Sequence, residues 1–101
     1  MAVKVLITRY FKEDKINEAH ELLRQLRSRA TMQPGYISGQ TLISTEKPNK
    51  LVVVSTWAGP NAWKRWESHL ERSSFIDRMS EYLERPEQKE VFHAGVPTED
   101  L

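Results

Sequence analysis

The stretch Leu51-Val52-Val53-Val54-Ser55-Thr56-Trp57-Ala58-Gly59-Pro60-Asn61-Ala62-Trp63-Lys64-Arg65-Trp66 decides the fold of this chain. Its first four residues are large and apolar, as is typical of a strand buried on both faces. Gly59-Pro60 ends this strand, because proline cannot continue a central strand but suits the first position of a helix. We therefore predict a central strand followed by a helix that carries Trp63 and Trp66 on one face.

Composition limits the class of protein. The 101 residues suffice for one domain with a modest core, and a net charge of +1 with mixed signs indicates no nucleic-acid or membrane partner. No apolar run reaches the ~18 residues that a membrane-spanning helix needs. The chain has no cysteine, which excludes disulfides and thiolate sites and favours a cytoplasmic location. The start, Met1-Ala2-Val3-Lys4, is expected not to be a signal peptide, because it runs straight into a strand pattern.

The first third of the chain reads as a strand and a helix. Apolar residues recur at helical spacing from Ile16 to Ala30 and predict an amphipathic helix with Asp14 as its N-cap. Pro34-Gly35 breaks the chain after this helix. Before it, residues 2–11 alternate between two apolar faces, with Val3, Val5, Ile7 and Phe11 on one face and Leu6, Thr8 and Tyr10 on the other.

The remainder reads as a hairpin, a broken helix and a last strand. An antiparallel hairpin is predicted over residues 36–56, in which Gly39 marks a bulge or a close approach. We expect the second helix to run from Pro60 to Leu70 and again from Ser74 to Leu83, with a fresh cap at Ser73-Ser74. The pattern around Val91-Phe92 predicts a final short strand.

The resulting order is β-α-β-β-α-β, the α+β pattern of ferredoxin-like domains with a four-stranded antiparallel sheet. We assign it to residues 1–95 and expect residues 96–101 to be a flexible tail. Two helices cover only one face of such a sheet. The other face carries Leu6, Tyr10 and alternate members of the strand from Leu51, a larger apolar patch than monomers usually expose. We therefore predict a homodimer with two sheets packed face to face.

Two sequence motifs resemble a known family. Pro34-Gly35-Tyr36 leading into the second strand, and Val54-Ser55-Thr56-Trp57 with Ala62-Trp63-Lys64-Arg65-Trp66, resemble antibiotic biosynthesis monooxygenase (ABM) domains. The resemblance covers residues 3–94 and implies a dimeric α+β barrel. The family includes cofactor-free monooxygenases of aromatic polyketides, haem-degrading enzymes, quinol monooxygenase-like proteins and members of unknown activity. The resemblance therefore indicates the fold more narrowly than the function.

The haem-degrading branch matches the sequence only in part. That branch uses an asparagine on the first strand, a tryptophan on the second helix and a histidine further along that helix. Trp66 matches the tryptophan, whereas Thr8 stands at the asparagine position and Ile76 near the histidine position. His69 lies too early in the chain to replace that histidine. Haem degradation is accordingly disfavoured.

The cofactor-free branch implies an aromatic pocket between helices and sheet. There the protein binds an electron-rich substrate, deprotonates it and stabilises the anion, which reacts directly with dioxygen. Trp57, Trp63 and Trp66 are candidate walls, although they would equally fill the core or the dimer interface. His69, one turn after Trp66, is the candidate catalytic base, although a half-exposed helical histidine is the plainer interpretation. Thr8, Tyr36, Phe75 and Met79 complete the candidate substrate-binding set.

Other chemistry has little support in the sequence. The histidines lack the spacing of metal ligands, and no phosphate loop, nucleophile elbow or dinucleotide fingerprint is present. We therefore expect neither a metal nor a cofactor. The predicted function is a cofactor-independent monooxygenase acting on a small aromatic or quinol-type molecule. The alternative is a non-catalytic dimeric module that binds a small molecule or serves a stress response.

Overall fold

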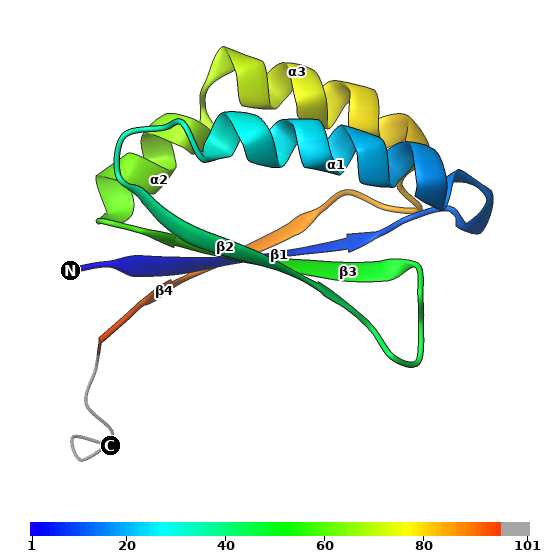
Figure 1. Cartoon of the computed structure of the whole chain (residues 1–101), viewed down its shortest axis with the longest axis horizontal. Helices are drawn as coiled ribbons and strands as arrows, with labels where there is room; N and C mark the ends of the chain where they lie inside the picture. The colour runs from blue at the N-terminus through cyan, green and yellow to red at the C-terminus, as the bar shows by residue number, and fades with distance from the viewer. Residues whose placement is uncertain (96–101) are drawn as a thin grey trace.

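The computed structural model describes residues 1–95, so the predicted tail lies outside the described residues. The helices and strands confirm the β-α-β-β-α-β order, with the second helix divided in two (Figure 1). Two short 3-10 helices, η1 and η2, flank this pattern. In chain order the elements are β1 (Val3–Tyr10), η1 (Glu13–Lys15), α1 (Ile16–Ala30), β2 (Tyr36–Ile43), β3 (Lys50–Trp57), α2 (Pro60–Glu67), α3 (Leu70–Met79), η2 (Ser80–Tyr82) and β4 (Gln88–His93).

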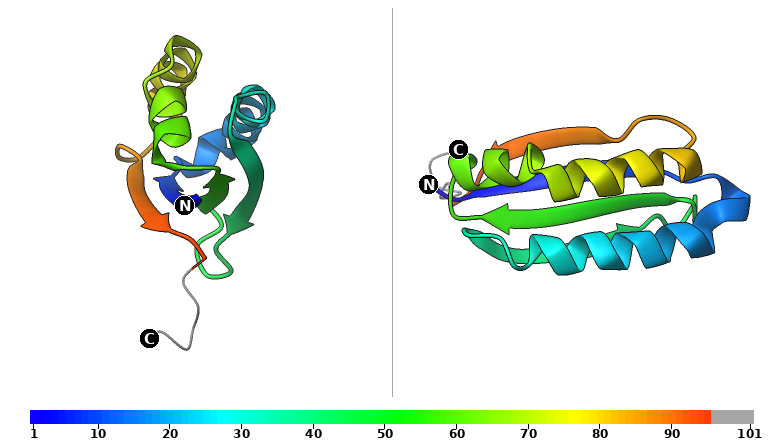
Figure 2. Two further views of the ribbon diagram at one scale, coloured as in Figure 1. Left: turned by 90° about the vertical axis from the view of Figure 1, so that its left-hand side faces the viewer. Right: turned by 90° about the horizontal axis from the view of Figure 1, so that it is seen from above.

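The four strands form one antiparallel sheet in the order β2-β3-β1-β4. The stretch from Leu51 thus supplies a central strand, and its pairing with β1 runs from Val3 opposite Trp57 to Tyr10 opposite Lys50. All three α-helices cover the same face of the sheet (Figure 1), and α1 and α3 lie side by side above it (Figure 2). The predicted ferredoxin-like α+β fold is confirmed.

Strand alternation decides what each face carries. Along β1 every second residue from Val3 to Arg9 is buried beneath the helices. On β3, Leu51, Ser55 and Trp57 are buried on the same side, whereas Val52 and Val54 face the other side and are only half-buried. No element of residues 1–95 covers the second face of β3, so burial on that side stays a prediction that depends on a second copy of the chain.

The first helix begins differently from the prediction. Asp14 lies inside η1 and does not cap α1; Lys15 occupies the N-cap position and makes no side-chain cap hydrogen bond. The short 3-10 turn replaces a cap by continuing directly into the helix. From Ile16 onward the predicted amphipathic pattern holds, with Ala19, Leu22 and Leu26 buried against the sheet.

The second helical region breaks earlier than predicted. The helix α2 ends at Glu67 and α3 starts at Leu70, so the expected cap residues Ser73 and Ser74 lie inside α3. The backbone of His69 is extended, and its Nδ1 accepts a hydrogen bond from the backbone N–H of Glu71 at 3.1 Å. Histidine therefore acts here as the N-cap, a role usually given to serine, threonine, aspartate or asparagine.

Two glycines allow close packing at the start of β2. A Cβ built on Gly39 would lie 2.5 Å from the hydroxyl oxygen of Tyr36, which confirms a close approach there, while the strand irregularity falls between Tyr36 and Ser38. Gly35 has a φ of +85°, and a Cβ on it would lie 2.5 Å from the Cβ of Ala62 on α2. The turn into β2 is thereby pressed against α2.

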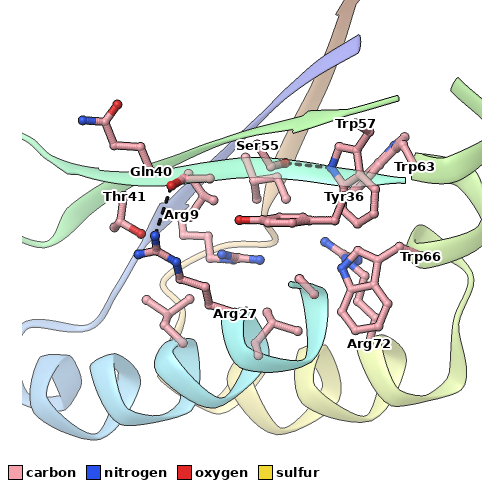
Figure 3. A pocket seen from close by; sticks show the side chains of 16 residues that line it. Arg9, Arg27, Tyr36, Gln40, Thr41, Ser55, Trp57, Trp63, Trp66 and Arg72 are labelled. Atoms are coloured by element: carbon pink, nitrogen blue, oxygen red, sulfur yellow. Dashed lines mark hydrogen bonds between the residues drawn. The ribbon is translucent and has the colours of Figure 1, made fainter. Parts of the chain in front are cut away.

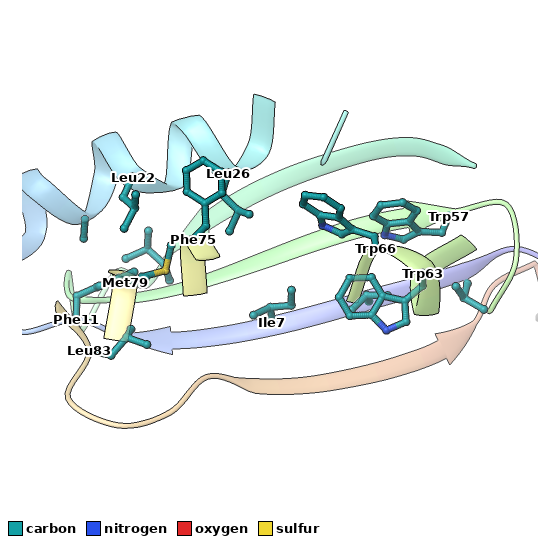
Figure 4. Close-up of a cluster of buried hydrophobic side chains, with 14 of the residues drawn as sticks. Ile7, Phe11, Leu22, Leu26, Trp57, Trp63, Trp66, Phe75, Met79 and Leu83 are labelled. Carbon is teal, nitrogen blue, oxygen red and sulfur yellow. The ribbon is translucent and has the colours of Figure 1, made fainter. Parts of the chain in front are cut away.

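The core fills the space between helices and sheet and changes character along its length. Phe11, Met79 and Leu83 fill one end, and Trp57, Trp63 and Trp66 gather at the other (Figure 4). The opposite sheet face has no such cover within residues 1–95. Its apolar side chains, termed here the open face, are Leu6, Leu42, Val52, Val54 and Phe92.

Candidate functional site

A cavity lies between α1, the tryptophans and the helix-covered face of the sheet. Its empty volume is about 570 Å³, part of which is open to solvent. Aliphatic side chains of β1, β3 and α1 line one part of it, and aromatic side chains of β2, β3 and α2 line another. The aromatic residues that line the cavity are Tyr36, Trp57, Trp63 and Trp66 (Figure 3).

The aromatic wall is fixed by contacts between its own members. The rings of Tyr36 and Trp57 meet edge to face, with centroids 5.3 Å apart and planes at 86°. Trp57 and Trp63 are 5.8 Å apart at 59°, and the indole N–H of Trp57 donates to Ser55 Oγ at 3.0 Å. Each tryptophan is no more than 3% exposed. These residues therefore both fill the core and wall the cavity, so the two sequence interpretations are not exclusive.

A buried ion cluster joins three distant parts of the chain beside this wall. Arg9 on β1 contacts Oε2 of Glu87 through Nε at 2.9 Å and Nη2 at 2.7 Å. Arg72 on α3 donates from Nη2 to Oε1 of the same carboxylate at 2.8 Å. The guanidinium carbon of Arg72 also lies 5.3 Å from the ring centroid of Trp63. The cluster Arg9–Glu87–Arg72 thus places two cations next to aromatic rings.

The charges of this cluster do not balance. Burial lowers the pKa of Arg9 from its ordinary value, the charge of Glu87 opposes this, and the charge of Arg72 adds to it. Burial alone would raise the pKa of Glu87, but the charges and hydrogen bonds of both arginines outweigh it and hold that pKa below its usual value. Because arginine stays protonated in proteins, the cluster keeps one net positive charge.

A third arginine stands at the edge of the cavity. Arg27 on α1 reaches across to β2, where its Nη2 donates to the backbone oxygen of Gly39 at 3.0 Å (Figure 3). Leu23, Arg27 and Thr41 line both this cavity and a neighbouring hollow that extends toward His20. Arg27 therefore lies at the boundary between the two spaces.

The structure brings together part of the predicted site. Tyr36, Trp57, Trp63 and Trp66 line one cavity, as expected if they act together; their part in binding a substrate stays a prediction. The other candidates lie elsewhere. Thr8 belongs to the sheet face away from the helices, Phe75 and Met79 pack in the core outside the cavity lining, and His69 caps α3.

His69 is poorly placed to act as a base in this cavity. Its ring centroid is 5.4 Å from that of Trp66, but His69 is not among the residues that line the cavity. Its Nδ1 lone pair is already engaged by the N–H of Glu71. The interpretation of His69 as a half-exposed helix residue agrees with this geometry.

Sequence reasoning missed the arginines of the buried cluster, although both carried a signal. Arg9 has the same parity as Val3, Val5 and Ile7 on β1, so alternation places it on the buried face. Arg72 stands three positions before Phe75 and shares its helical face. Glu87 precedes β4 in an irregular segment and had no periodic signal. A charged residue at an apolar position was the available clue.

Metal ligation has no support in the described residues. Within residues 1–95, no group of three or more histidine, aspartate or glutamate side chains is arranged to hold a metal ion. The cavity lining offers aromatic rings, guanidinium groups and hydroxyls instead.

Comparison with known proteins places the chain among related domains. The family model for antibiotic biosynthesis monooxygenase matches residues 2–78. A putative antibiotic biosynthesis monooxygenase from Nitrosomonas europaea superimposes with a TM-score of 0.87 at 15% identity, covering 96% of this chain and 93% of that one. A conserved protein from Methanosarcina mazei Go1 gives 0.87 at 17% identity, covering 94% of each chain.

A third solved structure has a described activity. SnoaB from Streptomyces nogalater, a cofactor-independent oxygenase crystallised in a mutant form, gives a TM-score of 0.84 at 14% identity and covers 96% of each chain. No curated protein matches the sequence. At these identities the structural likenesses establish the fold alone.

Proposed function

The chain belongs to the antibiotic biosynthesis monooxygenase family, and we propose that it is a cofactor-independent monooxygenase acting on a small aromatic or quinol-type molecule. The observation that carries this proposal is the cavity itself. Four aromatic side chains, those of Tyr36, Trp57, Trp63 and Trp66, wall a space bordered by buried guanidinium groups. Such a space suits a flat ring that becomes an anion during reaction.

The proposed chemistry assigns each part of the cavity a task. The aromatic walls hold the substrate ring and exclude water from it. Arg9 and Arg72 favour the deprotonated substrate, because a nearby positive charge lowers the pKa of an acidic group. In the reaction the substrate anion supplies the electrons to dioxygen; one oxygen atom enters the product and the other leaves as water. The proposal gives no catalytic role to His69, because it does not line the cavity.

A second function is favoured by one feature of the lining. Among the described residues that line the cavity, none is a histidine, aspartate or glutamate that would accept the substrate proton. A non-catalytic dimeric module that binds a small aromatic molecule would need no such group. In the catalytic case the substrate must give its proton to the solvent before the aromatic walls exclude water from it, which requires a substrate that is already acidic.

Oxygen consumption separates the two functions. Purified protein is incubated with a panel of phenols and quinols in an oxygen electrode, and binding of the same compounds is followed by tryptophan fluorescence. Uptake that saturates with one bound compound, and falls in a Trp66→Phe variant, supports the monooxygenase. Saturable binding without uptake across the panel supports the binding module. An Arg78→Met variant is the control, because Arg78 lies exposed on α3 outside the cavity.

The proposed assembly is a homodimer that packs two open faces together as an α+β barrel. Members of the family are commonly dimeric. In this chain Leu42 and Phe92 on the open face are 45% and 48% exposed, and Val52 and Val54 are only half-buried. A second copy would cover these side chains at once. Light scattering should therefore give twice the 11.8 kDa of one chain.

A cytoplasmic location stays a prediction from the sequence. Among residues 1–95 the structure has no helix with the length and apolar character needed to cross a bilayer.

A further inference from the structure

The buried cluster Arg9–Glu87–Arg72 is built from more donors than acceptors. Arg9 and Arg72 are 2% and 4% exposed, and both line the cavity. Glu87 accepts from Nε of Arg9 and Nη2 of Arg72, and Nη2 of Arg9 lies 2.7 Å from its Oε2. Among the described residues, Nη1 of each arginine has no hydrogen-bond partner. Each guanidinium therefore keeps at least one free N–H group.

The unpartnered nitrogens of the two guanidinium groups are not fully sealed inside packed protein. Within residues 1–95, no solvent-shielded side-chain nitrogen or oxygen of a buried or half-buried residue lacks a hydrogen-bond partner. The unpartnered nitrogens of Arg9 and Arg72 must therefore touch solvent-accessible space. Both side chains line the cavity, and the close-up shows their guanidinium groups directed into it (Figure 3). The cavity thus contains N–H donors of Arg9 and Arg72 that have no acceptor among the described residues.

The charge of the cluster specifies what kind of acceptor fits. Two guanidinium groups face one carboxylate, and among the described lining residues none is acidic. A buried charge without a partner is costly, so an occupant that supplies a negative charge is favoured over a neutral one. Planar guanidinium groups match planar carboxylates particularly well, because two parallel N–H groups meet two oxygen atoms. The adjacent rings of Trp63 and Trp66 suit a flat, apolar body attached to that carboxylate.

We propose that the cavity binds an aromatic carboxylate, with the ring among the tryptophans and the carboxylate on the free N–H groups of Arg9 and Arg72. Glu87 is then a positioning residue that holds both guanidinium groups toward the same place. As a statement about substrate, this inference rests on the proposed function, since it names the substrate class of the same cavity. The carboxylate is already charged when the molecule binds. It is therefore distinct from the anion that forms when the substrate loses a proton during turnover.

The test compares two probes of nearly identical shape, 2-naphthoate and the neutral 2-naphthamide. Binding is measured by isothermal titration and tryptophan fluorescence, without any requirement for turnover. The wild type should bind naphthoate about ten- to a hundred-fold more tightly, as expected for charge-assisted hydrogen bonds. Equal affinity for the two probes would overturn the proposal.

Matched variants locate the preference. Arg72→Met should remove most of the preference for naphthoate, because one of the two donors is lost. Arg78→Met removes the same charge from an exposed position of α3 and should keep the preference. Equal losses in both variants would show a general charge effect and overturn the site. If Arg72→Met does not fold, thermal shifts of the wild type decide: naphthoate should raise Tm more than naphthamide, and equal shifts refute the proposal.

The proposal and the monooxygenase can fail separately. A naphthoate preference with no oxygen uptake from any phenol, quinol or hydroxynaphthoate would support the carboxylate site and refute the monooxygenase. Oxygen uptake that is equal for phenols with and without a ring carboxylate, together with equal probe affinities, would support the monooxygenase and refute the carboxylate site.

Discussion

Arg9 and Glu87, which are 78 positions apart in the sequence, form a buried ion pair with 2.7 Å between Nη2 and Oε2. The pair joins the first strand to the segment that enters the last strand. Arg72 completes the cluster from α3, so one carboxylate holds three separate parts of the chain. Both the stability of the fold and the charge of the cavity consequently depend on Glu87.

Replacing Glu87 with glutamine should destabilise the protein strongly. The change leaves two buried guanidinium groups without a carboxylate, and removing one partner of a buried pair costs about 3–5 kcal/mol in the free energy of unfolding. Urea denaturation measures this loss. Glu81→Gln is the control, since Glu81 is exposed and makes no ion pair within residues 1–95, and it should change stability by less than about 0.5 kcal/mol. Equal effects of the two changes would contradict a structural role for the cluster.

Acid should remove the contribution of Glu87. Because its pKa in the folded protein is held below the ordinary value of 4.5, the unfolded chain takes up this proton first as the pH falls. The stabilisation is therefore complete above pH 4.5 and declines as the pH falls from there toward the lowered folded-state pKa. Urea denaturation between pH 7 and pH 3 should show a steeper decline for wild type than for Glu87→Gln.

Wild type and Glu87→Gln should both lose some stability at low pH for reasons unrelated to Glu87. A hydrogen bond from Arg24 is the main cause that lowers the pKa of exposed Glu21 to about 2, and this residue is unchanged in the variant. Only the difference between the two curves reports on Glu87. Parallel curves would show that its ionisation does not stabilise the folded state.

Replacing Trp66 with phenylalanine should distinguish its role in the cavity wall from its role in the core. The smaller ring keeps an apolar surface, so the fold and the dimer should persist with a loss of about 1–2 kcal/mol in stability. Affinity for an aromatic ligand should fall more than stability does, because part of the cavity wall is removed. Phe75→Leu is the comparison, since Phe75 packs in the core but does not line the cavity. That variant should lose stability while ligand affinity stays unchanged; equal affinity losses would argue against a wall at Trp66.

A lysine at position 54 should dissociate the proposed dimer. Val54 lies centrally on the open face, where it pairs with Leu6 on one side and Gln40 on the other. Two lysines brought together across a two-fold interface would repel each other and lose hydration. Light scattering should then give the 11.8 kDa of one chain. Asn61→Lys places the same charge on the exposed side of α2 and should leave the mass of the assembly unchanged.

Alanine at position 39 should disturb the cavity through Tyr36. The added Cβ would lie 2.5 Å from the hydroxyl oxygen of Tyr36 but 3.5 Å from its Cζ, so the hydroxyl is the main obstacle. Gly39→Ala should therefore weaken aromatic ligand binding, and adding Tyr36→Phe should restore much of it. Ligand titration of the two single variants and the double variant measures this coupling. Independent, additive losses would show that the contact does not matter.

The sequence was most informative where a periodic pattern recorded burial. Leu51 to Trp57 predicted a central strand, and the alternation of residues 2–11 predicted the two faces of β1. It was least informative where an unusual residue does a local task. Because a histidine is seldom an N-cap, the sequence pattern predicts the helix break at Ser73-Ser74, whereas the structure has the cap at His69.

The residues of the candidate site were likewise predictable only where a periodic pattern or a conspicuous residue type marked them. Trp63 and Trp66 stood out as large residues at helical spacing and Trp57 as a large residue at the end of a strand, and the structure places all three beside one cavity. Arg9 and Arg72 were hidden among surface charges, although periodicity put each on a buried face. Glu87 was out of reach, because only the folded chain brings a residue of an irregular segment next to β1 and α3.

The contact between Gly35 and Ala62 makes one packing unit of two motifs that stand far apart in the sequence. A side chain at position 35 would push α2 away from the turn, and Trp63 and Trp66 would move with it. The volume allowed at position 62 is therefore set by position 35, and position 35 is restricted further by its φ of +85°. If both codons were randomised and folded variants selected, the survivors should be pairs of very small residues. The shape of the cavity therefore depends on Gly35 and Ala62, although neither residue lines it.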